Sequence, residues 1–153
     1  MENLDEIDRK ILQLMQENAK LTTKELADKI KLSPTPTFER LKRLEREGFI
    51  DHYAAVLHPE KTGNGLIAFC NIRLKQHSRT IGLDFIQAVQ KIPEVTECYN
   101  ISGDYDFMIK IYVRDMPHYQ EFVLMRLGEI KSIGSLHSIF VIGEIKNSHA
   151  IPV

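Results

Sequence analysis

Hydroxyl and cationic side chains gather in the stretch from Thr22 to Ile50, at a spacing suited to contacting an anionic surface. Arginine can fork onto guanine or hold a phosphate, and threonine hydroxyls can do either at a helix start. At about 100° per residue, the cationic arc lies opposite an apolar arc of Phe38, Leu41 and Leu44, and Arg40 lies on the shoulder. The candidate DNA contacts are Thr22, Thr23, Ser33, Thr35, Thr37, Glu39, Arg40, Lys42, Arg43 and Arg46.

The same helix also fits a plainer interpretation, in which it is a solvated face laced with ion pairs. Three acids, Glu39, Glu45 and Glu47, lie among its four bases, so charge alone does not decide between the two.

Two helix starts would position these side chains. Thr22 and Glu25 have the spacing of a capping box, in which each side chain binds a free amide at the helix end. Ser33 can cap a second helix with Pro34 at its first position, and Gly48 can end that helix in a positive-φ conformation. Two helices joined by a tight turn, the second carrying cations, predict a helix-turn-helix.

The elements around this pair define the predicted domains. Asp5 can cap a first helix whose apolar residues recur at helical spacing from Ile7 to Met15. Residues 49–57 are rich in strand formers and predict a wing strand, and the polar, turn-rich residues 58–65 predict a hinge. We therefore expect a DNA-binding domain over 1–50, a wing and hinge over 51–65, and a second domain over 66–153.

The second domain reads as an α+β body. Strands are predicted over 66–74, 95–102, 106–113 and 138–146, with one helix ending before Pro93 and another capped by Asp115. The order β-α-β-β-α-β packs as a four-stranded antiparallel sheet with both helices on one face. The other face is apolar enough to predict that a second subunit covers it, which gives a homo-oligomer.

Composition bounds the class of protein. The 153 residues are 43% hydrophobic with a net charge of −1, and residues 1–50 hold ten basic against ten acidic side chains. DNA binding would then depend on local placement of charge and on dimerisation.

Cys70 and Cys98 form no paired motif, which favours a reducing compartment. With no signal peptide or membrane-spanning run, we expect a soluble, cytoplasmic protein without membrane partners, resident metal or cofactor.

Over almost its whole length, from Leu4 to about Lys146, the chain resembles the Lrp/AsnC family of leucine- and asparagine-responsive transcription regulators. The marks are the runs Asp8–Leu12, Glu25–Ala27, Leu32–Pro34, Arg40–Gly48, His58–Gly63 and Gly103–Asp106, in that order. The resemblance implies a winged helix-turn-helix head and a ferredoxin-like (RAM/ACT-like) body. It also implies binding to double-stranded promoter DNA, dimers that assemble to octamers, and a small amino-acid effector bound between dimers.

In that family the loop matching Gly103–Asp106 lines the effector pocket. A glycine turn lets backbone amides approach a carboxylate, and Asp104 or Asp106 could meet an α-amino group. An ordinary hairpin turn is the alternative. The opposite wall departs from the family pattern, since Lys131–Ile133 and Leu136–Ser138 stand where Pro-Gly-Val and Thr-x-Thr are usual. The resemblance implies the effector residues Ser102, Gly103, Asp104, Tyr105, Asp106, His137 and Ser138.

Three functions remain open. The first is an amino-acid-responsive transcription regulator, and the second is a DNA-binding regulator or architectural protein without a small effector. The third is an enzyme, because some proteins of this architecture are sirohaem decarboxylases. The six histidines form no metal-ligand pattern, and the chain has no Gly-rich phosphate loop and no nucleophile–base set. We therefore expect that the protein is not an enzyme.

Overall fold

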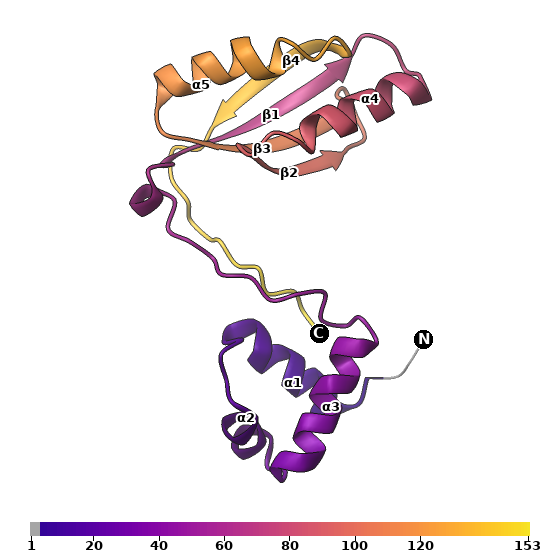
Figure 1. The fold of residues 1–153 in the computed structure, drawn as a ribbon, viewed down its shortest axis with the longest axis vertical. Coiled ribbons are helices and arrows are strands. Elements are labelled where there is room, and N and C mark those ends of the chain that lie inside the picture. The colour runs from indigo at the N-terminus through magenta and orange to yellow at the C-terminus, as the bar shows by residue number, and fades with distance from the viewer. Residues whose placement is uncertain (1–3) are drawn as a thin grey trace. The chain divides into compact units, whose positions relative to one another are not determined.

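The computed structural model describes residues 4–153, and its contacts divide the chain into two compact units (Figure 1). The first unit runs to Ala55 and also contains the C-terminal segment Ile145–Val153. The second unit is Val56–Glu144. The boundaries differ from those expected, because the last residues were assigned to the body and the structure groups them with the helices of the head.

Three helices form the head: α1 (Glu6–Glu17), α2 (Thr23–Ile30) and α3 (Pro34–Arg46). Capping boxes start α1 and α2, with Asp5 capping the first and Thr22 the second. After α3, Gly48 takes φ 78°, as expected for the residue that stops the helix. The core between the helices is Ile11, Leu12, Leu14, Met15, Leu26, Leu41 and Leu44.

The C-terminal segment binds helix α1. The backbone amide of Ile151 donates to Oε1 of Gln16 at 2.7 Å, and Nε2 of Gln16 donates to the Ile151 carbonyl at 3.0 Å. Val153 packs against the apolar core of the head. One glutamine therefore satisfies both backbone polar groups of Ile151, as a neighbouring strand would.

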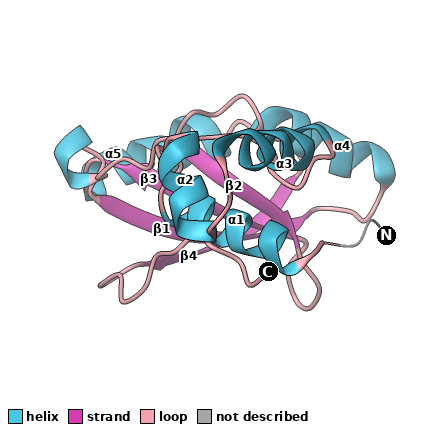
Figure 2. Cartoon of the chain, turned by 90° about the horizontal axis from the view of Figure 1, so that it is seen from below, coloured by secondary structure: helices cyan, strands magenta, loops and turns pink. Residues whose placement is uncertain are grey.

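The body has the predicted β-α-β-β-α-β order, with a four-stranded antiparallel sheet ordered β2-β3-β1-β4. Among the described residues, strands occur only in this unit (Figure 2). A 3₁₀ turn, η1 (Glu60–Thr62), precedes the sheet within this unit, and helix α5 (Met116–Phe122) continues into a π-helical turn, η2 (Val123–Leu127). The elements are β1 (Leu66–Leu74), α4 (Arg79–Val89), β2 (Val95–Asn100), β3 (Phe107–Val113), α5 (Met116–Phe122) and β4 (Ile133–Phe140).

Alternation along the strands separates two faces of the sheet. Every second residue of β1 and β3 is buried against α4 and α5, which cover one face (Figure 1). On the opposite face Phe69 stands in register between Lys110 and Ile139, and Ile139 is 46% exposed. The second face thus carries large apolar side chains that the helices do not cover.

Two predicted strands were wrong in position or type. The expected wing over residues 49–57 contains no strand. The last strand was predicted over 138–146, but β4 begins at Ile133 and ends at Phe140. The earlier start depends on Gly134. A Cβ at this position would lie only 3.1 Å from the backbone of Leu74, so the absence of a side chain lets the start of β4 lie close to the end of β1. The apolar run past Phe140 misled the prediction, since Ile142 is fully exposed.

Candidate DNA-binding surface and effector site

Helix α3 begins at Ser33 and Pro34, as expected, but the side-chain hydrogen bond in its first turn is not the predicted serine cap. Ser33 makes no side-chain capping bond. Instead the Thr37 hydroxyl donates to the Ser33 carbonyl at 2.9 Å, and Thr37 is completely buried. Thr37 was expected to contact DNA, but its side chain is buried and its hydroxyl is bonded within the helix, so it is not part of the exposed surface. Thr35 and Ser33 are exposed.

Two of the candidate arginines are held by acids of helix α1. Arg40 Nη1 donates to Asp5 at 2.6 Å and to Asp8 at 2.8 Å, and Arg43 Nη2 donates to Asp8 at 2.5 Å. The carboxylates raise the pKa of Arg40, and the pKa of Asp5 is lowered by the amide of Asp8 and by Arg40. Asp8 is 1% exposed, so these charges hold α3 against α1.

The outer face of α3 carries Lys42, Arg46 and an unexpected aromatic ring. Phe38 was predicted to pack inward, yet it is 48% exposed with Lys42 Nζ 5.7 Å from its ring centroid. Lys42 also pairs with Glu45 at 2.6 Å, and Arg46 lies 3.8 Å from Glu47. All four cations of the helix therefore have a carboxylate within 4 Å, so none of them is an unpaired positive charge.

The remaining candidates of the head lie at helix starts or on the outer arc. The Thr22 hydroxyl donates to Glu25 at 2.8 Å, so it is engaged in the capping box. Thr23 is half-buried, and Glu39 is exposed. The surface available to a DNA groove is thus Ser33, Thr35, Phe38, Glu39, Lys42 and Arg46, with Arg40 and Arg43 behind it.

The loop between β2 and β3 contains the glycine turn that was expected from the sequence. Gly103 has φ 112°, a conformation that side-chain-bearing residues rarely adopt. Ser102 and Asp104 are exposed, and the Asp104 carbonyl accepts hydrogen bonds from Nε and Nη2 of Arg73, at 2.9 and 2.5 Å. The guanidinium of Arg73 also lies 5.6 Å from the ring centroid of Tyr105. The exposed residue Asp104, the guanidinium of Arg73 and the ring of Tyr105 therefore lie together at this end of the sheet, with Arg73 bound to the Asp104 backbone carbonyl.

The carboxylate of Asp106 anchors this loop to the end of β1 and to the residues that follow it. Its Oδ2 accepts from the Leu74 amide at 2.7 Å, and Oδ1 lies 3.1 Å from Nδ1 of His77. Its carbonyl accepts from the side-chain amide of Asn100 at 2.8 Å. Of the two acids expected to meet an amino group, Asp104 is the one whose carboxylate points to solvent without such bonds among the described residues.

His137 and Ser138 were expected to form one wall, but they lie on opposite faces of β4. The His137 ring is near the Tyr105 ring, with centroids 6.3 Å apart, on the side of the loop. Ser138 pairs with Cys70 in the sheet, and its Oγ accepts from the Tyr119 hydroxyl under α5. Adjacent residues of a strand must point to opposite faces, so Ser138 does not line the loop site.

Sequence reasoning missed Arg73, Phe38 and the Asp5–Asp8 pair as parts of these surfaces. Arg73 is the one cation of β1, and its position on the face opposite the helices could have been found from alternation. The link from Asp8 to α3 spans more than thirty residues and leaves no local signal in the sequence.

Neither surface, as built from the described residues, contains a cluster of side chains that could bind a metal ion. Among residues 4–153, no three His, Cys, Asp or Glu side chains come together as metal ligands would. Within the same residues, no helix is both long and apolar enough to cross a membrane.

The head and body together define a class of protein, a DNA-binding helix-turn-helix joined to a ferredoxin-like α+β domain. Residues 4–51 match the winged helix-turn-helix DNA-binding family, and residues 67–151 match the Lrp/AsnC ligand-binding domain family. The chain belongs to the Lrp/AsnC family and is a DNA-binding transcriptional regulator.

Similar proteins agree over the full length. The DNA-binding transcriptional activator DecR of Escherichia coli (strain K12) is 36% identical, covering 98% of this chain and 99% of that protein. The leucine-responsive regulatory protein of the same organism is also 36% identical, over 99% and 92%. The crystal structure of the Neisseria meningitidis regulator NMB0573 in complex with L-Met has a TM-score of 0.95 at 38% identity, over 98% and 97%. These relatives are transcription regulators, not enzymes, in line with the expectation for this chain.

Proposed function

We propose that this regulator responds to a small amino acid bound at the Ser102–Asp106 loop. The observation that carries the proposal is that the exposed residue Asp104 lies beside Arg73, which binds its backbone carbonyl and stands over the Tyr105 ring at one end of the sheet. An amino acid offers an ammonium for the acid, a carboxylate for the guanidinium or the Gly103 turn, and a side chain for the ring. The similar regulator NMB0573 was crystallised with L-Met, which supports an apolar amino acid as the effector.

A thermal-shift screen of the full chain against the twenty amino acids tests this proposal, since a ligand that binds only the folded state raises the melting temperature. Asp104→Ala should abolish the shift without changing the melting temperature of the free protein. Glu121→Ala, at an exposed acid of α5, should leave the shift intact. If no amino acid shifts the wild type, the protein is a DNA-binding regulator without this effector.

For DNA, we propose that the exposed face of α3 enters the major groove, with Thr35, Lys42 and Arg46 as contacts and Arg40 and Arg43 as supports. Each exposed cation can exchange its carboxylate for a phosphate or a base edge. Arg46→Ala should weaken binding to an operator selected in vitro from random duplexes, and should lower the slope of log K against log salt by about 1 if it contacts phosphate. Lys10→Ala on α1 serves as the control, and equal affinities for both variants would refute this assignment.

We further propose that the open sheet face joins two copies of the chain, and that dimers assemble to octamers as the family resemblance implies. Phe69 and Ile139 are large apolar side chains on a face that the helices leave uncovered. Ile139→Glu should lower the solution mass, measured by light scattering after gel filtration. Ile142→Glu, at an exposed position beyond β4, should not. An oligomer unchanged by Ile139→Glu would place the interface elsewhere.

A further inference from the structure

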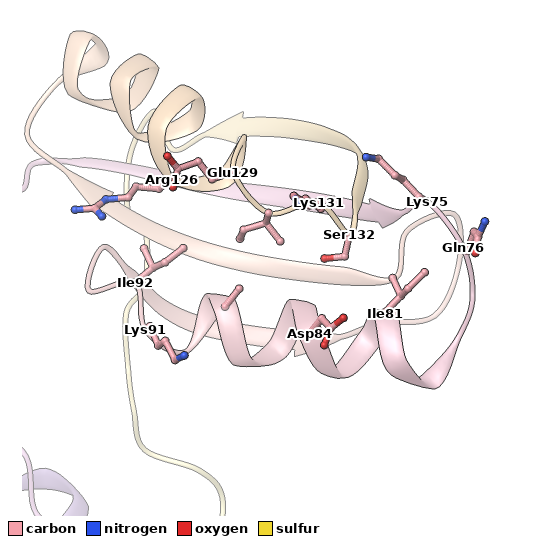
Figure 3. Close-up of a pocket in the computed structure, with 12 residues that line it drawn as sticks. Lys75, Gln76, Ile81, Asp84, Lys91, Ile92, Arg126, Glu129, Lys131 and Ser132 are labelled. Carbon is pink, nitrogen blue, oxygen red and sulfur yellow. The ribbon is translucent and has the colours of Figure 1, made fainter.

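A groove runs along the helical face of the body, between α4 and the segment that leads from η2 into β4 (Figure 3). Its volume is about 690 Å³, within the range of small-molecule sites. It lies on the sheet face opposite Phe69 and is lined by residues that the proposed effector loop does not include. A small organic molecule would therefore fit here without occupying the loop.

The floor of the groove is apolar. Ile81 and Ala88 contribute from α4, Ile92 from the turn after it, and Ile130 from the opposite wall, all half-buried. From Ile81 to Ala88 the helix rises about 10 Å. This floor suits an elongated apolar body, because covering it would remove half-exposed isoleucine side chains from water.

The rim of the groove is cationic. Lys91 and Arg126 stand at one end beside Ile92, and Lys75 stands at the other end beyond Ile81 (Figure 3). Lys131 adds a fourth cation, against two acids, Asp84 and Glu129. Across residues 4–153, the side chains of these four cations take part in no ion pair within 4 Å. In a chain whose net charge is −1, this is a local excess of unpaired positive charge.

A buried hydroxyl adds a polar group to the same wall. Ser132 Oγ is shielded from solvent and lacks a hydrogen-bond partner among the described residues. Buried hydroxyls usually have a partner, and in Figure 3 the Ser132 side chain points into the groove. A bound oxygen-bearing group would satisfy it.

From these features we propose that the groove binds an amphipathic organic anion. The apolar body lies on the isoleucine floor, and the anionic group is held by Lys91 and Arg126 at the end beside Ile92. Guanidinium and ammonium groups together favour a carboxylate or a similar oxyanion. A cation lacks this match, because four cations outnumber the two acids around the apolar floor.

The groove is connected to the effector loop through the chain between β1 and α4. The Lys75 amide donates to the Ser132 carbonyl at 3.0 Å, on the groove side. The preceding amide, that of Leu74, donates to Asp106 of the loop at 2.7 Å. A ligand whose anionic group is held by Lys91 and Arg126 and whose apolar body extends to Ile81 would thus approach the segment at Lys75 that anchors the loop. Binding in the groove could then influence the effector loop of the same domain.

Decanoate, below its micelle concentration, is a suitable probe, and decyltrimethylammonium is its control with an apolar tail of the same length and the opposite charge. We expect isothermal titration of the full chain to detect decanoate and not the cation. The double variant Lys91→Glu/Arg126→Glu should weaken decanoate binding at least about tenfold, or about 1.4 kcal/mol. Lys61→Glu, an exposed cation of η1 outside the groove, should bind as the wild type does.

Three results would overturn the proposal: no decanoate binding, equal binding of the cation, or full binding by the double variant. Circular dichroism checks that the double variant is folded, which its exposed positions favour. The proposal does not depend on amino-acid sensing. Asp104→Ala is expected to leave decanoate binding unchanged even where it abolishes an amino-acid shift, so failure of one proposal is distinguishable from failure of the other.

Discussion

Replacing Asp8 by asparagine tests whether buried charge holds the DNA-reading helix in place. The Asp8 carboxylate is 1% exposed and accepts bonds from Arg40 at 2.8 Å and from Arg43 at 2.5 Å. Asparagine keeps the volume but removes the charge and turns an amide toward the guanidinium groups. A hydrogen bond to a charged group contributes about 1.5–3 kcal/mol, and removing one partner of a buried pair costs more.

The partial exposure of Arg40 and Arg43 reduces the expected loss of stability. Their side chains are 29% and 38% exposed, so water can solvate them once Asp8 is neutral, and Arg40 retains Asp5. We therefore expect Asp8→Asn to lower the free energy of unfolding of the head by about 2 kcal/mol, which raises its unfolded population about 30-fold.

Hydrogen exchange measured by mass spectrometry can locate this loss. The most protected amides of α1 and α3 should exchange about 30-fold faster in Asp8→Asn, whereas amides of β1 and β3 should keep their wild-type rates, because they belong to the other compact unit. Glu6→Gln, at an exposed acid in the same first turn, is the control. Unchanged exchange in α1 and α3 would refute the reasoning, as would equal acceleration in the sheet.

Three further predictions follow from local geometry. Gly134→Ala places a methyl group 3.1 Å from the backbone of β1 and should destabilise the body by about 1–2 kcal/mol in urea unfolding, whereas Gly143→Ala meets nothing within 4 Å and should be neutral. The pKa of Asp5 is lowered from 3.8, so its stabilisation is present above pH 3.8 and is lost as the pH falls through the lower folded-state pKa; Asp5→Asn should remove this part of the acid dependence. Gln16→Ala should speed exchange of the Ile151 amide, and an unchanged rate would mean that the 2.7 Å bond does not protect it.

Much of this architecture can be predicted from local sequence patterns. The capping boxes at Asp5 and Thr22, the positive-φ stop at Gly48 and the alternation of β3 were predictable, because each depends on neighbours a few residues away. The order of strands and helices then leaves one antiparallel sheet topology, and the family resemblance follows from the same runs of residues.

The positions of charges and strand ends could not be predicted in this way. The helical wheel of α3 placed Phe38 inside, and Thr37 was expected to contact DNA, but Phe38 is exposed and Thr37 is buried. The register of β4 depends on how closely Gly134 approaches β1, a contact between residues sixty apart in the chain.

The sequence by itself thus determined the helices of the head, the β-α-β-β-α-β order of the body, and that the chain is a DNA-binding regulator of this family, but not the absent wing strand or the bounds of β4. The tertiary structure alone decided which charges are free to meet a ligand. Asp8 binds arginines of α3 and Ser138 turns under α5, whereas Asp104 and the groove cations are left open. The physical reason is that hydrogen-bond partners and burial come from residues distant in the chain, and local periodicity carries no information about them.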